Sequence, residues 1–126
     1  MIRLLICGSR SITDYSWAIQ QLNKLVLPYK SQIECIISGM ADGPDAFGAA
    51  FAISNDIKLL PFPAKWKVDG IFDPKAGFKR NQLMMDEGHP THILAMISKS
   101  SKTHGTDHMC SIAEKAGTIV KKIFYI

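Results

Sequence analysis

Short apolar runs alternate along the chain with segments whose apolar residues recur every three or four positions. Each run ends at glycine, proline or a polar cluster, which is typical of strands buried on both faces. The predicted strands cover residues 2–7, 33–38, 57–62, 92–97 and 119–125. Helical spacing predicts one helix from Asp14 to a break at Pro28, and others over residues 45–54, 75–87 and 105–116.

This alternation of strands and helices predicts an α/β fold. Right-handed crossovers between buried strands give a Rossmann-like three-layer domain with a mostly parallel five-stranded sheet. The default strand order for such a domain is 3-2-1-4-5. With 126 residues and no internal repeat or linker, we expect a single domain over residues 1–126. Residues 65–74 are expected to form a loop that carries Trp66.

Finer features follow from the same pattern. Ala18, Leu22, Leu25 and Tyr29 are spaced to share one face of the first helix. Asp14 and Asp45 each stand before an apolar periodic segment, so both are predicted to be helix N-caps.

Composition and charge restrict the classes of function. The apolar runs are too short for a membrane helix, and the apolar start flows into a turn cluster instead of a cleavage site. The three cysteines have no paired spacing, which favours a reducing cytoplasm, or a host cytoplasm if the gene is viral. The net charge of +4 comes from scattered lysines, so nucleic acid is not favoured as a partner.

Four polar clusters containing glycine flank the predicted strands and helices. They are Gly8-Ser9-Arg10, the segment from Ser38 to Asp45, the segment from Ala76 to Asn81, and the segment from Thr103 to Asp107. In open α/β sheets, ligand sites lie at the carboxyl ends of the strands, where the chain passes from a strand to a helix. Glycine permits close backbone approach, and a helix N-terminus offers free amides to an anion. The clusters therefore predict a small ligand that carries phosphate.

The first two clusters offer several contacts. Gly8 and Ser9 present amides and a hydroxyl, and Arg10 can reach toward the crevice. Ser38, Gly39 and Gly43 frame a tight turn. Asp42 or Asp45 could accept hydrogen bonds from ribose hydroxyls, although an exposed position is favoured for Asp42 and a simple N-cap suits Asp45 equally well.

The other two clusters lie at the starts of helices. Arg80 and Asn81, on the first turns of the third predicted helix, suit recognition of a phosphate or a base. We expect Arg80 at the border of the apolar faces, in the crevice and not in the core. Ser100 to Thr106 combines hydroxyls with Gly105 before the fourth helix, so this segment is the best candidate for a phosphate nest.

Metal and cofactor chemistry receive little support from the sequence. His104 and His108 are four residues apart, with Asp107 and Cys110 nearby, but spacing fixes no third ligand. No catalytic triad or carboxylate pair stands out. We therefore assign no metal and no cofactor, and the catalytic residues remain unknown.

Five segments in order resemble a known family. They are Gly8-Ser9-Arg10 with Thr13-Asp14, the segment from Ser38 to Asp45, Phe62-Pro63-Ala64-Lys65-Trp66, the segment from Ala76 to Met84, and Gly105-Thr106-Asp107 with Met109. This set is similar to the YspA-like branch of the SLOG superfamily, Rossmann-like domains related to the LOG phosphoribohydrolases and to the DNA-processing protein DprA. The resemblance covers residues 2 to 120.

The resemblance implies a nucleotide-related pocket at the carboxyl edge of the sheet. Arg80 matches the catalytic arginine of LOG-type enzymes, and Gly105-Thr106 matches their phosphate-binding Gly-Thr. Two departures stand out. Asp42 and Pro44 replace an arginine and an alanine that are common in the YspA-like pattern, and Met109 stands where LOG enzymes have glutamate. Asp107 is expected to point about 200° away from that position on the helix.

These observations favour a protein that binds a nucleotide or a nucleotide-derived small molecule. Two alternatives stay open. One is an enzyme that hydrolyses or transfers N-glycosidic bonds of nucleotides, with Arg80, Asp45 and Asp107 as candidate catalytic residues. The other is a nucleic-acid-binding module like DprA. No membrane partner is expected, and homo-oligomerisation is compatible with the sequence, which does not decide it.

Overall fold

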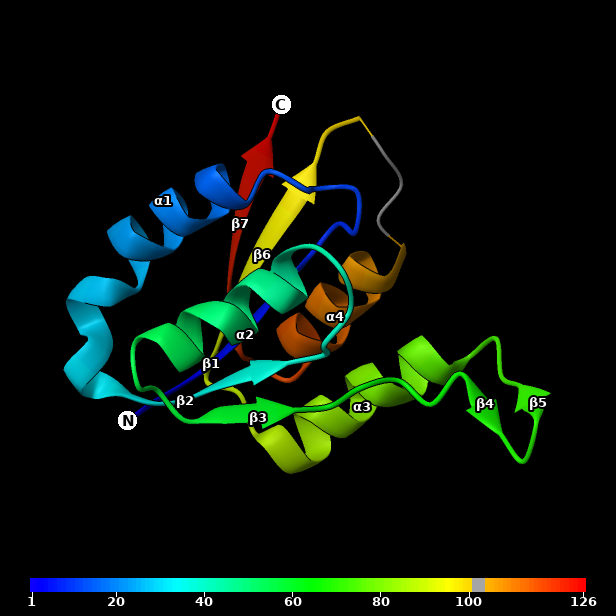
Figure 1. The fold of residues 1–126 in the computed structure, drawn as a ribbon. Helices are drawn as coiled ribbons and strands as arrows, with labels where there is room; N and C mark the ends of the chain where they lie inside the picture. Colours follow the sequence, from blue (N-terminus) through cyan, green and yellow to red (C-terminus); the bar gives the residue numbers. More distant parts are fainter. Residues whose placement is uncertain (101–103) are drawn as a thin grey trace.

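A parallel sheet forms the middle layer of the protein (Figure 1). The computed structural model describes residues 1–100 and 104–126. The five strands of the sheet are β1 (Ile2–Gly8), β2 (Ile33–Ser38), β3 (Leu59–Pro61), β6 (His92–Ser98) and β7 (Ile119–Tyr125). Their order is β3-β2-β1-β6-β7, and every neighbouring pair is parallel. The predicted α/β class and the default strand order are both confirmed.

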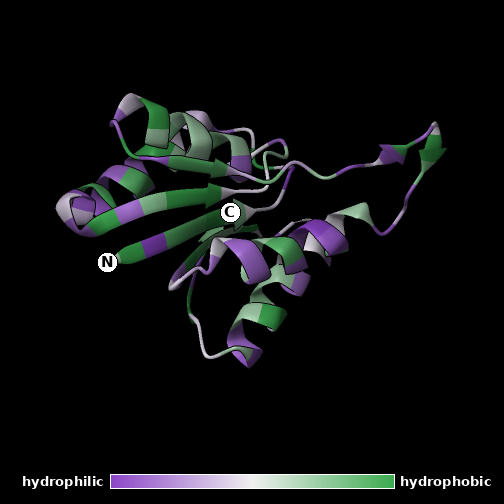
Figure 2. Ribbon diagram, turned by 90° about the horizontal axis from the view of Figure 1, so that it is seen from below, coloured by the Kyte–Doolittle hydropathy of each residue, from purple (hydrophilic) through white to green (hydrophobic). Residues whose placement is uncertain are grey.

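Helices cover both faces of the sheet, as Figure 2 shows. On one face lie α1 (Tyr15–Leu25) and α2 (Pro44–Ser54), and on the other lie α3 (Ala76–Gly88) and α4 (His104–Lys115). The first pair buries Leu22 and Phe51 against the sheet, and the second pair buries Met84 and Met109. These two cores explain why the strands are continuously apolar, because both of their faces are covered.

Local features agree with the sequence in part. Asp14 is an N-cap as predicted, since its carboxylate accepts a 3.0 Å hydrogen bond from the Trp17 amide. The first helix ends earlier than expected, and the chain continues as a 3-10 helix, η1 (Leu27–Gln32). Proline at the start of that turn favours this change of pitch. Tyr29 therefore lies in the 3-10 turn and is exposed, so its predicted place on the face of the first helix was wrong.

The segment predicted as a loop over residues 65–74 contains a hairpin. Its strands are β4 (Lys67–Val68) and β5 (Ile71–Phe72), which pair antiparallel. Between them Asp69 and Gly70 have φ of 52° and 79°. An Asp-Gly pair with positive φ forms the two-residue turn that matches the twist of a hairpin. The hairpin projects from the body of the protein in both overall views (Figures 1 and 2).

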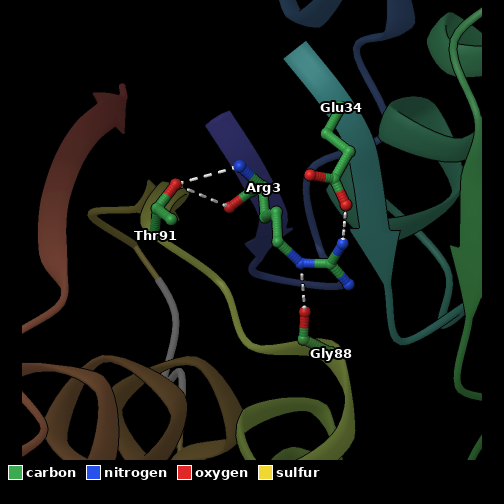
Figure 3. Close-up of polar contacts among 4 residues, drawn as sticks. All are labelled: Arg3, Glu34, Gly88 and Thr91. Carbon is green, nitrogen blue, oxygen red and sulfur yellow. Dashed lines mark hydrogen bonds and ion pairs between the residues drawn. The ribbon is translucent and has the colours of Figure 1, made fainter. Parts of the chain in front are cut away.

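Arg3 joins three elements at the amino end of the sheet (Figure 3). Its Nε donates a 2.8 Å hydrogen bond to the Gly88 carbonyl at the end of α3, and its guanidinium pairs with Glu34 of β2. Its backbone exchanges hydrogen bonds with Thr91, just before β6. A cation beside the last carbonyls of a helix also stabilises the helix dipole. This contact fixes the far end of α3, the helix that carries Arg80.

Across residues 1–100 and 104–126, every helix is too short or too polar to cross a lipid bilayer.

Candidate functional site

A cavity of about 450 Å³ opens at the carboxyl end of the sheet. It lies where β1 and β6 are neighbours, which is the point where the strand order reverses. In open α/β sheets this is the usual place for a ligand. The residues that line it come from three strand-to-helix junctions, from the hairpin segment and from α3: Cys7, Gly8, Ser9, Arg10, Ser11, Ala41, Asp45, Trp66, Pro74, Gly77, Phe78, Arg80, Asn81, Met84, His104, Gly105, Thr106 and Met109.

Most residues predicted to contact a ligand meet in this cavity. Its lining includes Gly8, Ser9, Arg10, Asp45, Arg80, Asn81, Gly105 and Thr106. Three predicted residues, Ser38, Gly39 and Gly43, are buried beside the cavity and do not line it. Of the predicted phosphate nest, Ser101, Lys102 and Thr103 lie outside the described residues. Their neighbour Ser100 is exposed, and Thr106 is buried at the start of α4.

Arg80 is the main buried cation of the site. It lines the cavity, as expected for a residue of the crevice, but it is only 9% exposed and so is more deeply buried than a position at the border of the apolar faces implies. Its guanidinium donates to the Gly39 carbonyl and, through Nε, to the Asn81 side-chain oxygen at 3.0 Å. Desolvation lowers the pKa of Arg80 from its usual value, and the Asp45 carboxylate opposes this shift. The burial follows from the missing side chain at Gly39, which leaves room for the guanidinium.

Asn81 connects α3 with the start of α4. Its side-chain nitrogen donates a 3.1 Å hydrogen bond to the Gly105 carbonyl and lies 3.1 Å from His108 Nδ1. The His108 ring in turn packs against Phe78, with 4.5 Å between the ring centroids. Asn81 therefore positions both Arg80 and the beginning of α4. Its role in holding these groups was not part of the sequence prediction, which assigned it to the ligand.

Asp45 is not the N-cap of α2, contrary to the prediction. Gly43, with φ of 83°, holds that position, and Pro44 is the first helical residue. Proline is preorganised for this place and needs no amide there. The Asp45 carboxylate instead accepts a hydrogen bond from the Ala41 amide at 3.4 Å. Burial raises the pKa of Asp45 to about 6, while the Arg80 guanidinium and the Ala41 amide oppose the rise.

Ser9 is already bonded to the neighbouring strand. Its amide donates to the Met96 carbonyl at 2.9 Å, so that amide is not available to a phosphate as the sequence suggested. Its hydroxyl accepts a 2.9 Å hydrogen bond from the Ser98 amide, and within residues 1–100 and 104–126 no acceptor takes the hydroxyl proton, which a ligand could therefore use. A Cβ on Gly8 would lie 2.2 Å from the Met96 carbonyl oxygen. Gly8 thus allows β1 and β6 to end close together.

Gly39 and Gly43 shape the site without facing it. A Cβ on Gly39 would lie 2.6 Å from Arg80 Nη1 and 2.8 Å from Asp45 Oδ2. The carboxylate and the guanidinium therefore flank Gly39. Gly43 needs its positive φ and packs against the Ser9 carbonyl, where a Cβ would be 3.0 Å away. Ser38 donates to the Asp45 carbonyl at 2.8 Å and accepts from the Met40 amide at 3.1 Å. Asp42 is exposed.

An aromatic end of the cavity was missed from the sequence as a binding element. Trp66 lines the cavity, with the Arg10 guanidinium carbon 5.5 Å from its ring centroid. Phe72 of β5 stacks on Trp66 with 6.0 Å between centroids and 9° between ring planes. Phe78 adds a second aromatic ring to the lining. Flanking apolar and proline residues signalled a loop, but no spacing rule connects Trp66 with residues in distant segments.

The start of α4 places two residues that bear on the enzymatic alternative, namely Met109, which the resemblance aligns with the LOG glutamate, and the nearby carboxylate of Asp107. Met109 is buried and lines the cavity, whereas Asp107 is exposed and does not. The expectation that Asp107 faces elsewhere is confirmed. Cys7, on the floor of the cavity, contacts Cys110 behind it, and this contact together with burial raises the pKa of the Cys7 thiol. The floor is therefore made of sulfur-containing and apolar side chains.

His104 and His108 start on the same helix but have different surroundings. His104 is exposed and lines the cavity, while His108 is engaged with Asn81 and Phe78. Burial lowers the pKa of His108, which favours its neutral form. Among the described residues no three His, Cys, Asp or Glu side chains gather as a metal site requires.

The profile of one protein family matches this chain. The YspA, cpYpsA-related SLOG family matches residues 2–68, which hold the first two junctions of the cavity and the hairpin strand β4. The chain belongs to this family. Membership indicates a nucleotide-related role, in binding or in modification. Neither a search of curated proteins nor a search of solved structures found a match.

This membership confirms the resemblance drawn from the sequence. The matched part of the SLOG domain ends before α3, so Arg80, Asn81 and the start of α4 stand on the geometry of the cavity alone. That geometry brings a buried cation, a helix start and two aromatic rings to one place.

Proposed function

We propose that this SLOG domain binds a nucleotide or a nucleotide-derived small molecule in the cavity at the carboxyl edge of the sheet. The observation that carries the proposal is the buried Arg80 guanidinium. Gly39 and Asn81 hold its Nη1 and Nε, and among the described residues no hydrogen bond occupies Nη2. A buried cation with an unused donor, beside a helix N-terminus, suits a phosphate. Arg10 and the Thr106 hydroxyl extend the polar part of the site.

A panel of nucleotides tests the proposal by thermal unfolding. Mono-, di- and cyclic nucleotides and ADP-ribose-type compounds are added, each at several concentrations. A ligand at about 100 times its Kd stabilises the folded protein by about 2.7 kcal/mol, which is on the order of 10 °C in Tm for a domain of this size. At least one member should produce such a shift. Flat melting curves across the whole panel contradict a nucleotide pocket.

A matched pair of variants assigns any shift to the cavity. Lys24→Met removes an exposed positive charge from α1, and Lys24 does not line the cavity. We expect this variant to keep the ligand-induced shift. Thr106→Val removes one hydroxyl from the lining and should reduce the shift, because the remaining amides and Arg80 still bind. A reduced shift in the lysine variant together with an unchanged shift in Thr106→Val would point to general charge attraction instead of the cavity.

Cleavage of an N-glycosidic bond is a second candidate function, favoured by one observation. Asp45 is a buried carboxyl in the cavity with a pKa of about 6, close to the value that suits acid–base catalysis. Against it stands Met109 at the position where LOG enzymes have glutamate. The absence of that carboxylate favours binding over hydrolysis.

A further inference from the structure

Trp66 is held in place by three separate parts of the chain. Phe72 stacks parallel to it, and the Arg10 guanidinium lies over its ring. The start of α3 approaches its edge so closely that a Cβ on Gly77 would be 3.3 Å from Trp66 Cη2. An aromatic ring fixed in this way offers a flat surface with little loss of side-chain entropy when a ligand stacks on it.

The base of the hairpin is tied to the helix that carries Arg80. The Asp73 amide donates a 2.7 Å hydrogen bond to the Trp66 carbonyl, which closes the hairpin where it leaves the body. The Asp73 carboxylate then accepts from the Lys75 amide at 2.9 Å and from Lys79 Nζ at 2.7 Å. The backbone of Trp66 and the first turn of α3 therefore form one connected unit.

This unit places an aromatic surface next to the buried cation. The point where a Cβ of Gly77 would lie is 3.3 Å from Trp66 Cη2 and 4.0 Å from Arg80 Nη2. Since Gly77 has no side chain, nothing from its own position fills the space between them. A planar aromatic group and an anionic group on the same small molecule could engage the two residues together.

We propose that Trp66 is the stacking platform for the base of the ligand, so that the cavity selects nucleoside phosphates over sugar phosphates and inorganic phosphate. The proposal rests on the proposed nucleotide-binding function and adds the end of the cavity that recognises the base. In the unliganded protein Arg10 lies over the Trp66 ring. A base that stacks there takes over this contact and leaves the Arg10 guanidinium to pair with the phosphate.

Fluorescence of Trp66 reports stacking directly. The chain has two tryptophans, and Trp17 lies on α1 against Tyr125, away from the cavity lining. Trp17→Phe therefore leaves Trp66 as the only tryptophan, which is excited selectively over the tyrosines. We titrate this variant with AMP, CMP and ADP-ribose, and in parallel with ribose 5-phosphate and inorganic phosphate. The nucleotide that binds should quench or shift the Trp66 emission with saturation, and ribose 5-phosphate should leave it unchanged.

Affinities measured by calorimetry then separate the two ends of the cavity. Stacking of a base on an aromatic side chain changes affinity by about 5- to 150-fold. The preferred nucleotide should bind the wild type at least about tenfold more tightly than ribose 5-phosphate binds it. In Trp66→Leu the two affinities should converge, because only the nucleotide loses its partner. Trp66→Phe should restore most of the preference, and circular dichroism with thermal melts checks that both variants fold.

The outcomes distinguish this proposal from the broader function. If Trp66→Leu weakens the nucleotide and ribose 5-phosphate by the same factor, or if Trp66→Phe restores nothing, Trp66 is structural and the platform is excluded while phosphate binding stands. A saturating emission change with ribose 5-phosphate equal to that with the nucleotide also excludes stacking. If neither these five probes nor any member of the wider nucleotide panel binds the wild type, both the platform and the proposed function fail.

Discussion

Arg80 combines a structural task with one directed at the cavity. Its guanidinium supports the Gly39 carbonyl and the Asn81 side chain, and its charge partly offsets that of the buried Asp45. Removal of Arg80 leaves the buried Asp45 carboxylate without its compensating charge, which is strongly destabilising. A loss of binding in an Arg80 variant is therefore ambiguous unless stability is restored independently.

We expect Arg80→Met to lower the free energy of unfolding by roughly 2–4 kcal/mol, because Asp45 then lacks its cationic neighbour and two acceptors lose their donor. Adding Asp45→Asn removes the buried carboxylate and should recover a large part of that loss. Nucleotide binding should stay at least tenfold weaker in the double variant. Urea unfolding and calorimetry on the same samples provide both values. Recovery of binding together with stability would show that Arg80 has only a structural role.

Asp45 itself should make the stability of the protein depend on pH. Its pKa rises from 3.8 in the unfolded chain to about 6 in the folded protein, so the folded state holds this proton more tightly. The contribution to stability is complete below about pH 4 and is lost as the pH rises through 6. A shift of this size corresponds to about 3 kcal/mol.

Asp45→Asn carries no titratable group and should avoid this loss. The variant is expected to be more stable than the wild type at pH 7.5, by up to about 3 kcal/mol. The difference should shrink steadily as the pH falls from 6 to 4. Urea unfolding at three pH values in this range measures the difference directly, and other titrating groups cancel between the two proteins. A difference that does not change with pH contradicts a raised pKa for Asp45.

At the scale of elements, the strand-to-helix junctions differ in how tightly they are packed. A Cβ added to Gly39, after β2, would lie within 2.8 Å of Arg80 Nη1 and Asp45 Oδ2. A Cβ added to Gly105, in α4, would meet no described atom within 4 Å. The sequence shows glycine at both junctions, and in both places it predicts close approach of the backbone to a ligand. Only the structure separates a glycine required by packing from one with open space.

This contrast predicts opposite results for the same substitution. Gly39→Ala should destabilise the protein by about 1–3 kcal/mol, since a buried methyl group must displace the Arg80 guanidinium or the Asp45 carboxylate. Gly105→Ala should be neutral or stabilising by up to about 1 kcal/mol, because alanine is the better helix former. Thermal or urea unfolding of both variants tests the pair. Similar losses in the two variants would show that the space beside Gly105 is not open.

The elements were predictable from sequence where a single local signal decided them. The five strands and Asp14 as an N-cap depend on apolar runs and on one side chain next to its own helix. Asp45 had the same local signal, yet Pro44 and the positive φ of Gly43 moved the cap back two positions. The hairpin was missed because its strands are two residues long and make no apolar run.

In the candidate site too, features set by neighbouring residues in the sequence were predictable, and features set by contacts between distant segments were not. Cluster positions at strand ends identified most of the cavity lining, because parallel strands bring their carboxyl ends to one edge. The burial of Arg80 and the platform at Trp66 depend on contacts across long separations, from Arg80 to Gly39 and from Trp66 to Arg10. No periodicity in one sequence encodes such contacts.

At the scale of the whole molecule, the strand order decides which chemical groups reach the cavity. The β3-β2-β1-β6-β7 order brings α2, α3 and α4 to the reversal beside β1 and β6. Of the described residues that line the cavity, Asp45 is the only carboxylate, since Asp107 is exposed outside it and Met109 occupies the inward position of α4. The described lining thus contains two arginines and two aromatic rings, but a single carboxylate that could activate water.

This balance predicts binding without turnover. Cleavage of an N-glycosidic bond builds positive charge on the ribose, and a carboxylate usually stabilises that charge or activates the attacking water. The Met109 thioether does neither. Asp45 is buried, and its carboxylate and the Arg80 guanidinium both lie against Gly39. We therefore expect no release of free base from AMP or CMP above the uncatalysed rate, measured by chromatography after a long incubation. Asp45→Asn and Asp107→Asn serve as controls and should give the same trace. Steady base release by the wild type that disappears in one of them would instead identify the carboxylate that has taken over the missing glutamate's role.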